Sequence, residues 1–125
     1  MKSQTNIEYK NKVYILSFNL NVMEIIQDEY GTLEKWGELT AGEPNAKAVK
    51  FGFGAMLNEG VDIYNEDHEG EEGFEPRKYF TPSQVGRLIT EIGLAEVQGK
   101  LHDVVIESVD DGTESKNEAT TETTK

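Results

Sequence analysis

Alternating apolar and polar residues near the start of the chain predict a β-hairpin over residues 7–18. Ile7 and Tyr9 alternate with polar residues, Asn11 lies in a polar stretch that suits a turn, and a segment rich in β-branched and aromatic residues follows up to Phe18. A two-stranded hairpin alone is only marginally stable in water. We therefore expect it to pack on the helices that follow.

Apolar residues then recur at helical spacing, which predicts four to five short helices. The first is expected at Leu20–Tyr30, because Asn19 can cap its start and Gly31 its end. A second, shorter helix is expected to follow Thr32, which can cap it in the same way.

A third helix is expected to have Pro44 in its first turn and to end at Gly60. Its buried face should consist of the apolar side chains of Ala46, Val49, Phe53, Met56 and Leu57. Gly52 and Gly54 each cost about 1 kcal/mol relative to alanine inside a helix, and we expect close packing against a neighbouring element to offset that cost. Residues 65–75 are charged and predict an exposed loop.

The sequence Thr81-Pro82-Ser83-Gln84 predicts the start of a fourth helix with a capping box, and Gly93 should end that helix. A fifth helix is expected from Leu94 to about Ser108, before the Asp-Asp-Gly sequence that starts at position 110. The apolar signal disappears after that, which predicts a disordered, acidic, polar tail over 109–125. The predicted fold is therefore α+β and mostly helical, with a single domain at 1–108.

Charge and composition narrow the function. The 125 residues include 24 acidic and 12 basic ones, for a net charge of -12. Such a charge disfavours nucleic acid and anionic membrane surfaces as partners, and favours a basic or amphipathic protein. The chain has no cysteine, which excludes disulfides and thiolate metal sites. Neither a signal-peptide pattern nor an apolar run of the ~20 residues that span a bilayer is present, so a cytoplasmic location is expected.

The motifs that could carry chemistry are incomplete. Asn65, Asp67, Glu69 and Gly70 match positions of an EF-hand calcium loop, but the position that should supply a bidentate glutamate is Pro76. The two histidines lack further ligands for a metal site, and no serine lies in a nucleophile motif. We therefore predict no enzyme, no cofactor and no metal, and favour a protein-binding domain.

Four segments together resemble a known family. They are Tyr14–Phe18, the stretch at 19–31, Ala48–Leu57, and Phe80–Gly93 with its Thr-Pro helix start and Ile-Gly end. Their order is similar to that of the small tail assembly chaperones of long-tailed bacteriophages and of related prophage or gene-transfer-agent particles. The resemblance covers roughly residues 13–108. It implies a short β-element, then helices, and one further helix after the Thr-Pro-capped one.

The resemblance also implies a function. Such proteins bind the tape measure protein in the host cytoplasm, keep it soluble and promote assembly of the tail tube around it. They are absent from the finished particle, and many are also made in a longer form by ribosomal frameshifting. The tail tube protein and further copies of the chain are additional candidate partners, whereas nucleic acid and membranes are not.

We hypothesise that large apolar side chains contact the partner, because aromatic residues are enriched in binding hot spots. The candidates are Trp36, Phe51, Phe53, Met56 and Tyr79. A regular third helix cannot turn Phe51 and Phe53 toward the same core, so one of them should be exposed. Alternative functions are a structural tail-completion or head–tail connector protein of the virion, an acidic inhibitor that mimics nucleic acid, and a calcium-responsive module.

Overall fold

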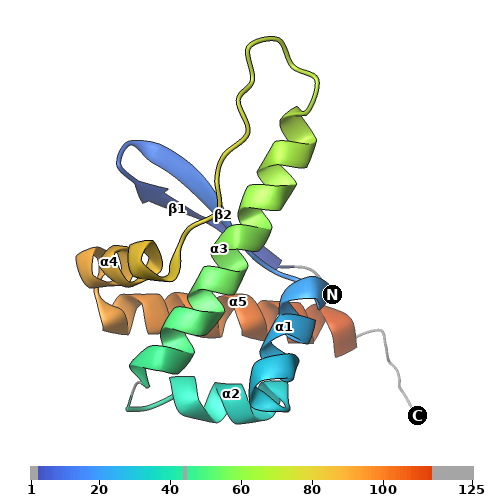
Figure 1. Ribbon diagram of the computed structural model, residues 1–125. Coiled ribbons are helices and arrows are strands. Elements are labelled where there is room, and N and C mark those ends of the chain that lie inside the picture. Colours follow the sequence, from blue (N-terminus) through green and yellow to red (C-terminus); the bar gives the residue numbers. More distant parts are fainter. Residues whose placement is uncertain (1–2, 44, 114–125) are drawn as a thin grey trace.

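A computed structural model describes residues 3–43 and 45–113, and it begins with the predicted hairpin (Figure 1). Strands β1 (Ser3–Tyr9) and β2 (Lys12–Phe18) pair antiparallel, with Tyr9 opposite Lys12 next to the turn. Lys10 and Asn11 form that turn with φ values of 52° and 66°. Two successive residues with positive φ give the type of turn whose twist matches that of the two strands. The hairpin prediction is confirmed, although β1 begins earlier than Ile7.

The described residues after the hairpin form five helices. They are α1 (Leu20–Tyr30), α2 (Leu33–Thr40), α3 (Ala46–His68), α4 (Pro82–Ile92) and α5 (Leu94–Thr113). The α+β, mostly helical fold class is thus confirmed. Helices α1 and α4 have the predicted bounds because their caps form as expected: Asn19 accepts from the Val22 N–H, and Thr81 and Gln84 make a complete capping box.

The predicted end of the third helix at Gly60 is wrong, because α3 continues to His68. Residues 65–68 are therefore helical and not part of a loop. Gly60 lies where α3 crosses β2, and a methyl group added there would collide with the carbonyl oxygen of Ile15. This glycine allows a close crossing of two elements and does not stop the helix. Pro44 lies outside the described residues, and Asn45 caps α3 by accepting from the Ala48 N–H.

The fifth helix also extends further than predicted, to Thr113 instead of about Ser108. Aspartate and glycine each disfavour a helix by at most about 1 kcal/mol. That cost does not end a helix that already propagates from a packed stretch, because each further residue adds a hydrogen bond. The predicted disordered tail at 109–125 therefore begins too early, and its remainder, 114–125, lies outside the described residues.

Helix α3 is the central element, and it packs against β2 and all four other helices (Figure 1). The expected close packing at its glycines is present: the indole of Trp36 lies against Gly52, and a side chain of α4, Val85, would lie 3.3 Å from a Cβ at Gly54. Its apolar side chains Val49, Phe53, Met56 and Leu57 are buried as predicted, whereas Ala46 is exposed. The buried side of α3 thus belongs to one hydrophobic core that it shares with the hairpin and the other helices.

Candidate functional site

Residues 69–81 connect α3 to α4, and we call them the returning segment because they run back along α3. Polar side chains of α3 hold this segment in place. Asn58, Asp62 and Asn65 follow one another at a spacing of four and three residues, which places them on one helix face. The Asn65 side chain makes two hydrogen bonds to the backbone of Arg77, donating to its carbonyl oxygen (3.0 Å) and accepting from its N–H (2.9 Å).

Asn58 binds Phe80 in the same way, two helical turns earlier. It donates to the Phe80 carbonyl oxygen over 3.2 Å and accepts from the Phe80 N–H over 2.7 Å. Between these two anchors, the Tyr79 hydroxyl donates to the Asp62 carboxylate over 2.7 Å. The returning segment is therefore fixed along α3 at three points.

Stacked rings secure the end of α3 to the same segment. The Arg77 guanidinium lies 3.7 Å from the ring centre of Tyr64 and 4.6 Å from that of Tyr14 on the hairpin. The rings of Tyr64, His68 and Phe74 form a compact cluster, in which His68 stacks on Tyr64 at a centroid distance of 4.0 Å and lies 5.6 Å from Phe74, and Phe74 lies 6.0 Å from Tyr64. Cation–π and stacking contacts of this kind stabilise a loop that has little core of its own.

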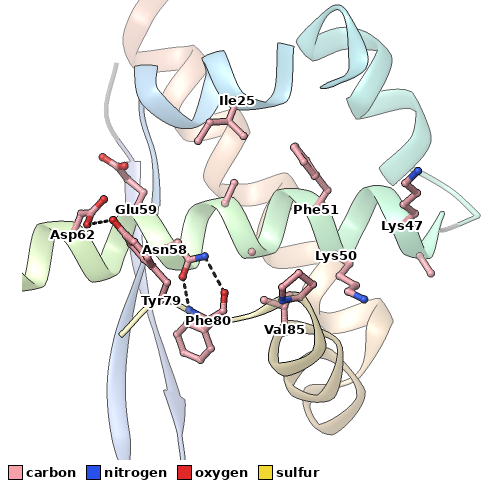
Figure 2. A pocket seen from close by; sticks show the side chains of 14 residues that line it. Ile25, Lys47, Lys50, Phe51, Asn58, Glu59, Asp62, Tyr79, Phe80 and Val85 are labelled. Atoms are coloured by element: carbon pink, nitrogen blue, oxygen red, sulfur yellow. Dashed lines mark hydrogen bonds between the residues drawn. The ribbon is translucent and has the colours of Figure 1, made fainter. Parts of the chain in front are cut away.

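Between this segment and α1 lies a groove of about 810 Å³ that follows the outer face of α3 (Figure 2). Its floor is part of α3, and Ile25 of α1 forms one wall. The opposite wall belongs to the returning segment and α4, and consists of Tyr79, Phe80, Pro82 and Val85. Gly54 and Ala55 also line the groove, and because both are small they leave space above this part of the helix.

The groove exposes large apolar side chains to solvent. Ile25 is 42% exposed and Tyr79 is 59% exposed. Phe51 is half-buried, with its ring packed edge-on against Tyr30 at a centroid distance of 5.6 Å. Contiguous apolar surface at a concave site is typical of a binding site for another molecule.

Charged groups flank the apolar lining of the groove. Lys47 and Lys50 lie toward the start of α3, and Glu59 and Asp62 lie further along it (Figure 2). The hydrogen bond to Asp62, together with the negative charge of that carboxylate, raises the pKa of Tyr79 above its ordinary value. The Tyr79 hydroxyl thus remains a donor near neutral pH.

The structure places the five predicted contact residues in two different environments. Trp36, Phe53 and Met56 are 2%, 0% and 0% exposed, so they cannot reach a partner while the domain stays folded. For these three the contact hypothesis needs correction, because helix α3 turns Phe53 and Met56 toward the hairpin and core, and the Trp36 indole N–H donates to the Ala48 carbonyl oxygen. Phe51 and Tyr79, in contrast, both line the groove.

Sequence reasoning missed the other parts of the groove, above all Ile25, Ala55 and the polar stripe Asn58, Asp62 and Asn65. The spacing of that stripe was available as a signal, because three such residues on one helix face need a partner when they are partly buried. The expected helix end at Gly60 separated Asn58 from the other two and concealed the pattern.

A second hollow, of about 420 Å³, lies between the hairpin turn and the returning segment. Basic side chains dominate its lining, which includes Lys10, Lys12, Arg77, Lys78 and Arg87. Its chemistry therefore differs from that of the apolar groove, although Tyr79 and Phe80 contribute to both.

Within the part of the chain that the structure describes, no three histidine, aspartate or glutamate side chains are grouped so that they could hold a metal ion. None of the described helices combines the length and the apolar character needed to cross a bilayer. Comparison with known proteins found no match to a family model, to a curated protein sequence or to a solved structure.

Proposed function

We propose that this protein is a tail assembly chaperone that binds a helical segment of the tape measure protein in the host cytoplasm and keeps that protein soluble while the tail tube assembles. The observation that carries the proposal is the open apolar groove along α3. The identity of the partner comes from the family resemblance, and the mode of binding comes from the groove.

The walls of the groove favour a helix as the occupant. An extended peptide binds by adding to a sheet edge, where free backbone groups supply hydrogen bonds. Here the floor is helical and its backbone groups are already paired within α3. In the returning segment, the backbone groups of Phe80 and Arg77 are taken by Asn58 and Asn65. A helix, which pairs its backbone groups within itself, therefore suits this site better than an extended peptide does.

A chaperone function agrees with this geometry. A long helical protein with apolar stripes aggregates when those stripes are exposed, and covering a stripe with a groove on an acidic carrier would keep it in solution. The net charge of -12 favours fast encounter with basic segments of such a partner.

Co-expression with a tape measure protein of a long-tailed bacteriophage tests the proposal. Ala55→Arg places a long side chain on the groove floor and should abolish the gain in soluble tape measure protein that the unaltered chain gives. Ala95→Arg, at an exposed position of α5, is the matched control and should retain the gain. Thermal unfolding should show that both variants fold.

Two results would argue against this function. Full solubilisation by the Ala55→Arg variant would exclude the groove as the binding site. Recovery of the protein in purified virions by mass spectrometry would favour a structural tail-completion or head–tail connector protein instead, because a chaperone leaves before the particle is finished.

A further inference from the structure

The groove has charge of opposite sign toward its two ends. Lys47 and Asp62 are separated by 15 residues of α3, which corresponds to about 22 Å along the helix axis. The lysines and the carboxylates of the lining do not alternate: Lys47 and Lys50 come first, then the apolar and small residues, then Glu59 and Asp62 (Figure 2).

The carboxylates are held in place by neutral donors. Glu59 accepts hydrogen bonds from the side-chain amides of Asn19 (2.7 Å) and Asn21 (3.2 Å) at the start of α1, and Asp62 accepts from the Tyr79 hydroxyl. Neutral donors orient a carboxylate without cancelling its charge. This end of the groove therefore presents two positioned negative charges.

The basic end is also shaped by its neighbours. The side chain of Lys50 extends past Gly86 of α4, where an added Cβ would lie 3.7 Å from the lysine Cε and Nζ atoms. That separation is an ordinary van der Waals contact, so the Lys50 side chain runs beside α4 at this position. Long basic side chains commonly cover apolar surface with their stems and keep the charged end in water.

From this arrangement we infer that the groove selects a helix of about four turns that has acidic side chains at one end, an apolar stripe in the middle and basic side chains at the other end. The acidic end lies over Lys47 and Lys50, and the basic end lies over Glu59 and Asp62. The inference rests on the proposed function, because it specifies which helix the chaperone captures and in which direction.

The charges at the two ends of the groove would determine the direction in which the partner helix binds more than they would increase its affinity. The apolar stripe of the partner can slide or reverse on the floor between Phe51 and Ala55 with little change in buried area. A reversed helix, however, places like charges against each other at both ends, which is unfavourable. The groove would thus distinguish two orientations that an apolar surface alone would accept equally.

Four synthetic helical peptides of about 15 residues test this inference. They share one leucine stripe and differ only at the ends: acidic and basic, acidic at both, basic at both, or neutral. Binding to the full chain is measured by fluorescence anisotropy at low salt, where charge interactions are least screened. The peptide with opposite ends should bind about tenfold more tightly than either peptide with like ends, a factor that corresponds to about 1.4 kcal/mol.

Charge reversal in the protein should change this order in a defined way. The double variant Lys47→Glu/Lys50→Glu should prefer the peptide that is basic at both ends, and Glu59→Lys/Asp62→Lys should prefer the one that is acidic at both ends. Glu91→Lys/Glu96→Lys, at exposed positions outside the groove, is the control and should keep the original order. Circular dichroism verifies folding, and the milder pair Glu59→Gln/Asp62→Asn replaces the reversal if that variant does not fold.

Direction is measured with a nitroxide label on the peptide that has opposite ends. A label at its acidic end should broaden the amide signals around Lys50, and a label at its basic end should broaden those around Asp62. The reverse pattern, or equal affinity for all four peptides, would overturn the inference and leave helix capture standing. Failure of every peptide to bind would overturn both the inference and the proposed function.

Discussion

The two sides of α3 differ in what lies against them, although both carry apolar residues. On the inner side, Phe53, Met56 and Leu57 are 0% exposed beneath the hairpin and the other helices. On the outer side, Phe51 and Ala55 line a groove that no described element fills. The helix is thus part of the core on one side and the floor of an open groove on the other.

This difference shows that apolar character alone does not separate stability from binding along a helix. The free energy of unfolding depends on the inner side, where burial is complete. Under the proposed function, partner affinity depends on the outer side, where apolar surface is still available to be buried. Substitutions on the two sides should therefore affect different measurements.

The largest expected effect comes from the pair Phe53→Ala and Phe51→Ala. Truncating Phe53 should lower the free energy of unfolding by about 4 kcal/mol, because it removes a fully buried ring. Truncating Phe51 should cost roughly half as much, because its ring is only half-buried, yet it should weaken binding of the helical peptides. Urea unfolding and anisotropy titrations measure the two quantities, and equal stability losses would mean that Phe51 is also core.

The next effect concerns the crossing of α3 over β2. Gly60→Ala should lower the free energy of unfolding by about 3 kcal/mol, because the new methyl group cannot be accommodated against the Ile15 carbonyl without moving the strand. Gly99→Ala in α5 is the control: its Cβ would meet open space, so that variant should gain up to about 1 kcal/mol of stability. If Gly60→Ala were as stable as the control, β2 would have to move away from α3 at little cost in free energy.

Gly60 also marks the limit of what the sequence could predict. Local rules predicted α1 and α4 correctly, because the caps at Asn19, Gly31 and Thr81 lie within a few residues of the bonds they make. A glycine inside a helix is ambiguous by the same rules, since it can end the helix or allow a close crossing. Only the position of β2 decides, and that contact spans more than forty residues of sequence.

The groove was predictable only in part, for the same reason. Phe51 and Tyr79 were identified as aromatic residues suited to binding, but so were Trp36 and Phe53, which are buried. Composition indicates which side chains bind well and not which way they face. The wall opposite α1 exists because Asn58 and Asn65 hold a segment that lies 22 and 12 residues away in sequence.

A substitution that detaches this wall from α3 should have an intermediate effect on stability. Asn58→Ala leaves the Phe80 N–H and carbonyl oxygen without their partners, which should cost about 2 kcal/mol and increase hydrogen exchange at the Phe80 amide. Asn21→Ala, at an exposed position with a single 3.2 Å bond, is the control and should change stability by less than about 0.5 kcal/mol. Unchanged exchange at Phe80 would show that the returning segment is held by other contacts.

The smallest effect is expected at Tyr30, which packs against Phe51 and so links the groove to the core. Its hydroxyl is buried and has no hydrogen-bond partner among the described residues. Replacing it by phenylalanine keeps the ring and removes the unpaired group. Tyr30→Phe should therefore leave the free energy of unfolding at pH 7 unchanged or raise it by up to about 1 kcal/mol.

The pH dependence of stability tests whether the Tyr30 hydroxyl is shielded from water in the folded protein. Burial, and secondarily the nearby Glu29, raises the pKa of Tyr30 above its ordinary value of 10.0. The unfolded chain then releases this proton at a lower pH than the folded protein, so the contribution of Tyr30 to stability is full below pH 10 and decreases as pH rises through the folded pKa. Urea unfolding at a series of pH values should show a shallower alkaline loss for Tyr30→Phe than for the unaltered protein. Parallel curves would mean that water already reaches the hydroxyl and that the edge of the groove near Phe51 is more open than its packing against Tyr30 indicates.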